Sequence, residues 1–114
     1  MSGLRVQRLA DSMRDILGSC FTGARLNDPR LQGVSVTSVR LSGDLQIASV
    51  YFRSFSDQDQ AIMLKGLYSC KGYLRNVLAE NLFLRRVPEL RFFYDSSIEN
   101  GLRVEELLHK INNA

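Results

Sequence analysis

The apolar residues of this chain first recur at the spacing of an amphipathic helix between about Arg5 and Ala24, with charged residues on the opposite side. A second such segment begins at Ser56 and Asp59, which have the S-x-x-D form of a capping box, and runs to about Ser69. The apolar positions are Val6, Leu9, Ala10, Met13, Ile16, Leu17, Cys20 and Phe21 in the first segment, and Ala61, Leu64, Leu67 and Tyr68 in the second. The pattern therefore predicts two amphipathic helices on either side of a middle segment of different character.

Gly72 interrupts the second helical pattern, which then resumes and continues to about Leu84. Two helical pieces that meet at a glycine imply a bend, because glycine tolerates an altered backbone and lets another surface approach. We expect the bend at Cys70, Lys71 and Gly72, with the two helical arms crowded together there. The arm after the bend has its apolar positions at Leu74, Val77, Leu78 and Leu82.

The middle segment alternates in the manner of β-strands, and the predicted strands are Val34 to Leu41 and Leu45 to Phe55. Ser42-Gly43-Asp44 between them is typical of a hairpin turn. Within the first strand the apolar phase changes from even to odd positions, which predicts a β-bulge near Thr37.

Pro88 ends the helical pattern, and Leu90 to Asp95 is predicted as a third strand. A second possible capping box, Ser96 with Glu99, precedes a last predicted helix. The apolar positions of that helix are Val104, Leu107, Leu108 and Ile111. The predicted order is α-β-β-α-kink-α-β-α, which favours an α+β fold with helices on one side of a three-stranded sheet.

The length of 114 residues predicts one domain, residues 1–114. No apolar run approaches the roughly 18 residues that a membrane helix needs, and the first residues lack the apolar core of a secretory signal. A cytoplasmic protein without a membrane contact is therefore expected. The two cysteines, Cys20 and Cys70, are far apart and lie in no C-x-x-C pattern, so we expect small buried hydrophobes in place of a disulfide or zinc site.

The net charge of +3 is unevenly distributed, and 12 of the 15 basic residues are arginines. Between Lys65 and Arg91 six basic residues face two acids, Glu80 and Glu89. Such a run is often a solvated face, but it also suits an anionic partner, most often nucleic acid. Arginine favours the second interpretation, because its planar guanidinium binds phosphate with two bonds and stacks on bases.

Residues with catalytic potential are scarce. The only histidine, His109, has Glu106 three residues before it but no second cluster to complete a metal site. Gly18 to Gly23 spells G-x-x-x-x-G, but Ala24-Arg25 stands where a phosphate loop requires Lys-Ser/Thr. The sequence therefore predicts no enzyme, no cofactor, no metal and no small-molecule substrate.

The basic residues form the remaining candidate site. Lys71 and Arg75 are one turn apart and can share a helix face, and Tyr73 beside them could stack on a base or lie at the core edge. Arg85 and Arg86 are expected at a helix C-terminus, where they would bind phosphates or simply complement the helix dipole. The candidate RNA-binding residues are Arg5, Arg8, Arg30, Lys65, Lys71, Gly72, Tyr73, Arg75, Arg85 and Arg86. Among the aromatic residues of the third strand, Phe92 and Tyr94 are predicted in the core, so that Phe93 faces outward.

Several runs of residues resemble one known family. They are Asp28-Pro29-Arg30-Leu31, Leu41-Ser42-Gly43-Asp44-Leu45, Cys70-Lys71-Gly72-Tyr73-Leu74-Arg75, Arg85-Arg86-Val87-Pro88-Glu89-Leu90 and Phe92-Phe93-Tyr94-Asp95. Together they resemble ribosome-binding factor A, over roughly residues 3 to 110. The resemblance implies a KH-like fold of type II in which a kinked helix pair replaces the G-x-x-G loop, and no G-x-x-G occurs in this chain.

The resemblance also implies a function: a monomeric, non-catalytic assembly factor that binds the small (30S) ribosomal subunit and precursor 16S rRNA. It would support late maturation, including processing of the 5′ end, and be important in the cold. Some members carry a charged tail after the last helix, and a function residing in such a tail is not expected of a chain ending at Ala114. The alternatives are a KH-like module for other RNAs, or a protein–protein adaptor that uses the apolar helix stripes.

Overall fold

The computed structural model describes residues 3–22, 26, 28–54 and 59–96. Its elements are α1 (Gly3–Cys20), the short 3-10 helix η1 (Pro29–Leu31), β1 (Val34–Leu41), β2 (Ile47–Ser54), α2 (Gln60–Ser69), α3 (Lys71–Leu82) and β3 (Glu89–Tyr94). This order confirms the prediction as far as the third strand. The capping box at Ser96 and the last predicted helix lie outside the described residues.

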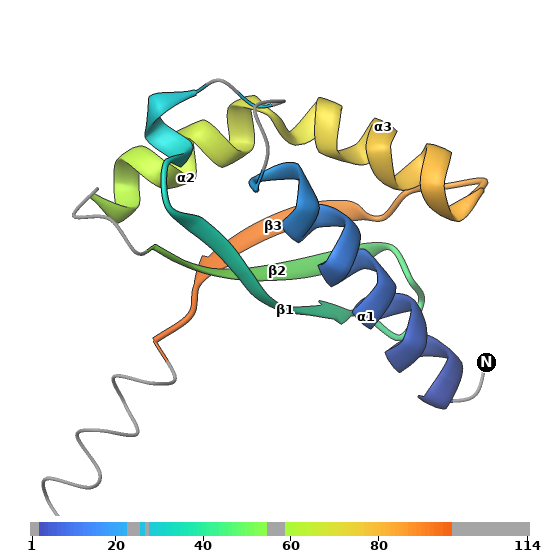
Figure 1. Ribbon diagram of the computed structural model, residues 1–114. Helices are drawn as coiled ribbons and strands as arrows, with labels where there is room; N and C mark the ends of the chain where they lie inside the picture. Colours follow the sequence, from blue (N-terminus) through green and yellow to red (C-terminus); the bar gives the residue numbers. More distant parts are fainter. Residues whose placement is uncertain (1–2, 23–25, 27, 55–58, 97–114) are drawn as a thin grey trace, which may run out of the picture.

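The three strands form one sheet in the order β1-β2-β3. β1 and β2 pair antiparallel as a hairpin, whereas β3 pairs parallel to β2. The connection from β2 to β3 runs through α2 and α3, and all three α-helices lie on the same side of the sheet (Figure 1). The α+β architecture with helices on one side is therefore as predicted.

The bulge in β1 lies where the apolar phase changes. Val36 pairs with Phe52 and Ser38 pairs with Tyr51, so Thr37 is the extra residue. The Thr37 hydroxyl lies 2.6 Å from a carboxylate oxygen of Asp95 and donates a hydrogen bond across the sheet. The bulge thus lets Val36 before it and Val39 after it face the core, and the hydrogen bond of Thr37 joins β1 to Asp95, the residue that follows β3.

The hairpin turn differs in detail from the prediction, because β2 begins at Ile47 and not at Leu45. Leu45 has a φ of 60°, so this residue, not Gly43, adopts the left-handed conformation of the turn. Asp44 holds the turn: its carboxylate accepts hydrogen bonds from the Ser42 hydroxyl at 2.7 Å and the Gln46 N–H at 3.1 Å.

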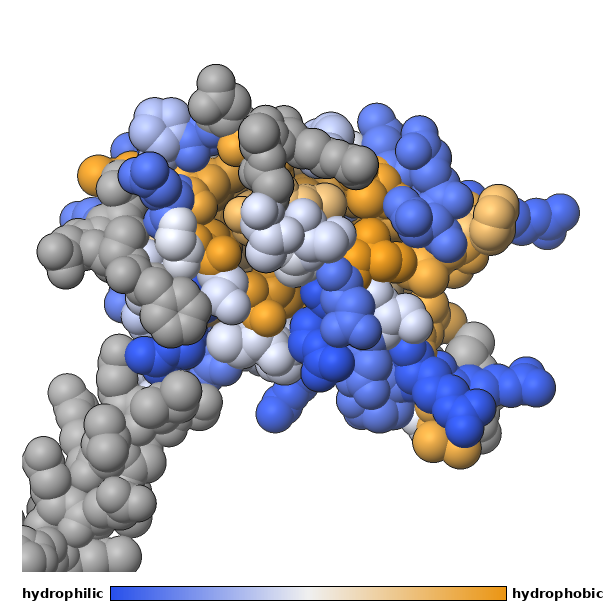
Figure 2. Space-filling model, in the orientation of Figure 1, coloured by the Kyte–Doolittle hydropathy of each residue, from blue (hydrophilic) through white to orange (hydrophobic). Residues whose placement is uncertain are grey.

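The core lies between the inner face of the sheet and the three helices. Its largest fully buried side chains are Met13, Leu17, Val50, Phe52, Met63, Leu67, Leu74, Leu78 and Leu90. Apolar side chains fill the seam between α1 and α3, while hydrophilic side chains gather over the outer sides of both helices (Figure 2). Cys20 is buried, as predicted, and Cys70 is half-buried. Within the described residues, no helix has the length and apolar character needed to span a membrane.

Three predicted helix ends need correction. α1 ends at Cys20, before the predicted limit of Ala24. Asp59 caps α2 by accepting a hydrogen bond from the Ala61 N–H at 2.7 Å, so the predicted cap at Ser56 is wrong. α3 ends at Leu82, because Phe83 adopts a left-handed conformation that terminates the helix.

Candidate nucleic-acid interface

The predicted bend between the second and third α-helices is present, and Cys70 makes it. Its φ of −98° and ψ of 8° lie outside helical geometry. The Cys70 N–H donates to the carbonyls of Gly66 and Leu67, each at 3.2 Å, and its own carbonyl accepts the Leu74 N–H at 3.0 Å. One residue therefore closes α2 and opens α3, so the two helices lie nearly end to end (Figure 1).

Gly72 is the second residue of α3, and the structure corrects the reason expected for it. Its φ is not positive, and a Cβ added there would meet no neighbouring heavy atom within 4 Å. The bend therefore does not depend on glycine, and the helical arms do not crowd this position. The missing side chain instead leaves the backbone of the first turn of α3 open to solvent.

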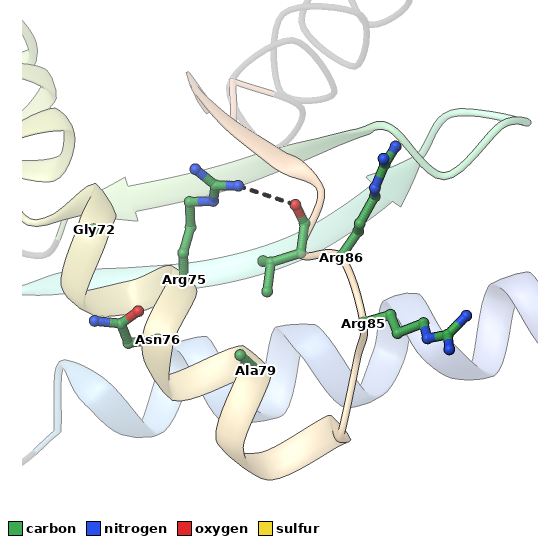
Figure 3. A pocket seen from close by; sticks show the side chains of 7 residues that line it. Gly72, Arg75, Asn76, Ala79, Arg85 and Arg86 are labelled. Carbon is green, nitrogen blue, oxygen red and sulfur yellow. Dashed lines mark hydrogen bonds between the residues drawn. The ribbon is translucent and has the colours of Figure 1, made fainter.

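Gly72 lines an open pocket of about 570 Å³ with residues from α3 and from the segment that follows it (Figure 3). The full lining is Gly72, Arg75, Asn76, Ala79, Arg85, Arg86 and Val87. A second open pocket shares the three arginines and continues along the turn before β2 and the start of β3. We call Arg75, Arg85 and Arg86 the arginine cluster.

Local structure brings the arginine cluster together. The left-handed Phe83 turns the chain back after α3, so that residues 84–88 return alongside the helix toward β3. The Arg75 guanidinium donates a hydrogen bond to the Val87 carbonyl at 3.2 Å, which joins the helix to the returning segment (Figure 3). Arg85 and Arg86 lie in this segment, beyond the C-cap Phe83, so their predicted position at the helix C-terminus is wrong, and neither lies in the last turn, where the helix dipole acts.

The electrostatics leave the cluster available to an anion. In the part of the chain that the structure describes, none of the three arginines forms an ion pair. The two acids that line the second pocket already have partners: Glu89 pairs with Arg91 at 3.3 Å, and Asp44 accepts bonds from Ser42 and Gln46. The bond from the Ser42 hydroxyl is the main cause that lowers the pKa of Asp44.

The remaining candidate residues are more dispersed. Lys71 and Tyr73 share the first turn of α3 with Gly72, and the Lys71 ammonium lies 5.9 Å from the centre of the Tyr68 ring. Arg30 lies in η1, away from the cluster, and holds Asp28 by an ion pair of 2.7 Å. The exposed residues Arg5 and Arg8 lie on α1, and Lys65 lies on α2.

The structure adds two residues that the sequence analysis did not identify. Asn76 lines the pocket four residues after Gly72, a helical spacing that could have indicated it. Phe83 is 91% exposed beside Arg85, and no sequence signal predicts a left-handed phenylalanine.

Neither cysteine chemistry nor metal binding competes for this site. Burial raises the pKa of the Cys70 thiol to about 11, so it is protonated at neutral pH. No group of His, Cys, Asp or Glu residues suited to holding a metal occurs within the described ranges.

Comparison with known proteins gives a consistent result. A sequence model of the family described as ribosome-binding factor A matches residues 5–108. The crystal structure of ribosome-binding factor A from Thermus thermophilus is 30% identical, with a TM-score of 0.71 over 78% of this chain and 93% of that one. The solution structure of a Thermotoga maritima protein assigned as a ribosome-binding factor A is 30% identical, with a TM-score of 0.72 over 87% and 94%.

A third similar structure is a Thermus thermophilus ribosome-binding factor A homology model fitted into the electron-microscopy map of a 30S complex. It is 31% identical, with a TM-score of 0.66 over 80% of this chain and 96% of that one. The fold shared with these proteins is of KH type II, with three helices on a mixed three-stranded sheet.

Proposed function

Because the chain belongs to the ribosome-binding factor A family, we propose that it binds the small ribosomal subunit and that the arginine cluster contacts 16S rRNA. The family consists of non-catalytic ribosome assembly factors. The related Thermus thermophilus protein, fitted into the map of a 30S complex, supports the choice of partner. The single observation that carries the choice of surface is that three arginines, none of which forms an ion pair with a described residue, line one open pocket.

The chemistry of the pocket suits a phosphate backbone. Each guanidinium offers two parallel N–H donors that match a phosphate, and a polynucleotide presents phosphates at regular intervals. The neighbouring N-terminus of α3 has no side-chain cap, so its helix dipole also favours negative charge near Gly72. Such contacts weaken as salt rises, which suits a factor that binds an assembling particle and then leaves.

In this proposal the bend at Cys70 replaces the G-x-x-G loop with which KH domains usually clamp nucleotides. The whole chain acts as one RNA-binding domain, as a monomer, in the cytoplasm. Its contribution is to late maturation of the subunit, including formation of the 5′ end of 16S rRNA, with the greatest need in the cold. The candidate residues outside the cluster, such as Arg5 and Lys65, are expected to add weaker contacts.

The proposal is tested by replacing Arg85 and Arg86 with alanine, singly and together. Arg14→Ala is the matched control, because it removes one exposed arginine that pairs with Asp15 at 3.2 Å on α1. Binding to purified small subunits is measured by co-sedimentation, and RNA affinity by filter binding over a range of salt concentrations. In a plot of the logarithm of the binding constant against the logarithm of the salt concentration, each lost phosphate contact should make the slope less steep by roughly 0.7 to 0.9. Arg14→Ala should leave the slope unchanged.

The melting temperature of each variant separates binding from folding. It should stay near the wild-type value, because both side chains lie outside the helix and the core. Wild-type affinity in the double variant would contradict the placement of the site. Salt-sensitive RNA binding by the wild type without co-sedimentation would favour a KH-like module for other RNAs. The absence of salt-sensitive RNA binding by the wild type would favour a protein–protein adaptor.

A further inference from the structure

The face of the sheet turned away from the helices carries side chains that the arginine cluster does not include. The buried pairs of the inner face, such as Val50 with Phe92, alternate with outward pairs such as Tyr51 with Phe93. We call this outward surface the open face. Its side chains are Ser35, Ser38, Arg40, Ile47, Ser49, Tyr51, Arg53, Glu89, Arg91 and Phe93.

Two aromatic rings form the centre of the open face. The ring centroids of Tyr51 and Phe93 are 5.6 Å apart with an interplanar angle of 30°, and Phe93 is 44% exposed. The Arg40 guanidinium lies over the Tyr51 ring, 5.7 Å from its centre. A cation over one ring and an adjacent ring that is partly open to solvent make a platform of the kind on which nucleobases stack.

The charge of the open face favours a nucleic acid over a protein as its ligand. Three arginines, Arg40, Arg53 and Arg91, surround the rings. The nearby acids are Glu89, which pairs with Arg91, and Asp95 directly after β3, whose carbonyl accepts a hydrogen bond from Arg53 at 3.3 Å. The positions between them are occupied largely by serines, so these strands offer no broad apolar patch to the apolar face of another protein. Positive charge around the exposed Phe93 ring and the half-buried Tyr51 ring complements a ligand that combines phosphates with flat bases.

We propose that the open face is a second nucleic-acid surface, which takes single-stranded RNA by stacking a base on the exposed Phe93 ring beside Tyr51 and binding phosphate with Arg40. This site is additional to the arginine cluster, and the inference rests on the proposed function only for the choice of RNA as the ligand to test. Glu89 belongs to the open face and also lines a pocket shared with Arg85 and Arg86, so the two surfaces adjoin at the start of β3.

The experiment uses the full chain and a ten-nucleotide RNA that contains 5-iodouridine, which crosslinks to a stacked aromatic side chain on irradiation. Crosslinked residues are identified by mass spectrometry. The expected crosslinks are to Tyr51 and Phe93, and they should persist in the Arg85→Ala, Arg86→Ala double variant at low salt. Persistence there makes the test independent of the site assigned to the arginine cluster.

Affinity measurements then separate stacking from charge. Phe93→Thr keeps a residue suited to strands and should weaken binding about tenfold without changing the salt dependence, because no phosphate contact is lost. Phe93→Tyr is the matched control and should bind as the wild type does. Arg40→Gln should instead flatten the salt dependence by roughly 0.7.

Three results would overturn the inference. The first is a crosslink pattern that omits both rings. The second is wild-type affinity in folded Phe93→Thr, with melting temperature as the check on folding. The third is an NMR spectrum in which the Phe93 ring contacts residues 97–114 or another protein and does not respond to RNA. None of these results would affect small-subunit binding through the arginine cluster, so the two proposals can fail separately.

Discussion

α2 and α3 each carry a glycine near an arginine, yet the two places have opposite characters. In α2, Gly66 is buried, and a Cβ added there would lie 2.9 Å from Cδ2 of Leu31 and 3.1 Å from Cβ of Arg30. The glycine therefore admits η1 against the helix, and Arg30 holds Asp28 beside it. In α3, Gly72 meets no neighbour within 4 Å, and the arginine cluster beside it has no acidic partner in the described chain.

The comparison separates structural from functional use of the same residue types. Around Gly66 the contacts are made within the molecule, by η1 on the helix and by Arg30 with Asp28, so substitutions there should change stability. Around Gly72 the groups are left for a partner, so substitutions there should change binding.

The largest effect is expected for Gly66→Ala. The new methyl group overlaps Cδ2 of the buried Leu31 side chain and is tight against Cβ of Arg30, so either the Leu31 side chain or η1 must shift. The free energy of unfolding should therefore fall by roughly 1–3 kcal/mol. Urea denaturation measures the change. RNA affinity of the folded fraction should stay at the wild-type value. A variant as stable as the wild type would show that η1 adjusts freely, and it would contradict a structural role for Gly66.

Phe83→Gly is expected to act in the opposite direction. A left-handed conformation costs a residue with a Cβ roughly 1–2 kcal/mol, and the exposed Phe83 ring has little packing to lose, so the variant should gain about 1 kcal/mol. The same denaturation series checks this, with Phe83→Ala as the control that removes the ring and keeps the Cβ. A destabilised glycine variant would mean that the ring packs in solution.

Gly72→Ala should have a smaller effect on stability. Alanine is the better helix residue and meets no obstruction here, so the free energy of unfolding should rise by about 0.5 kcal/mol. If the open backbone faces rRNA, the methyl group should nevertheless weaken co-sedimentation with small subunits. Unchanged binding in this variant would limit the site to the arginine cluster.

The smallest effect is expected at Cys70, which lies between the two regions. Burial raises the pKa of its thiol from 9.0 to about 11, which means that the folded state favours the neutral form. This stabilising contribution is complete below about pH 9 and is lost as the pH rises through 11. Cys70 should therefore add no pH dependence to stability between about pH 6 and 8, and iodoacetamide should alkylate Cys70 in the folded protein far more slowly than in the unfolded chain. Rapid alkylation at about pH 8 would contradict this burial.

Sequence periodicity predicted the α-helices and strands up to β3 and the bulge at Thr37, because burial on one face imposes a period that a bulge must interrupt. Periodicity could not decide which of two nearby residues caps a helix or adopts the left-handed conformation of a turn. Ser56 and Asp59 are both suited to capping a helix, and Gly43 is better suited than Leu45 to a left-handed turn. Tertiary contacts and the hydrogen bonds of Asp44 decide these cases, and they have no signature in the local sequence.

The candidate site shows the same limit. Arg75 and the pair Arg85 and Arg86 were recognisable as basic residues, but only the reversal at Phe83 brings them to one pocket. In the same way, the sequence pattern singled out Gly72 as the glycine at the bend and gave no signal for Gly66, although Gly66 is the glycine in close contact. The difference between them is set by η1, which packs on one and not on the other.

The parallel pairing of β2 with β3 has a consequence for the order of folding. The β1–β2 hairpin joins neighbours in sequence, whereas Ile47 must find Glu89 across the segment that includes both α2 and α3. Closing the longer loop costs more entropy, so β3 is expected to dock late, after the helices have formed. The arginine cluster bridges α3 and the segment that leads into β3, and it is therefore complete only at that last step. RNA that binds only the completed cluster would shift the folding equilibrium toward the folded state by mass action. Bound RNA would therefore stabilise the last step of folding, the docking of β3.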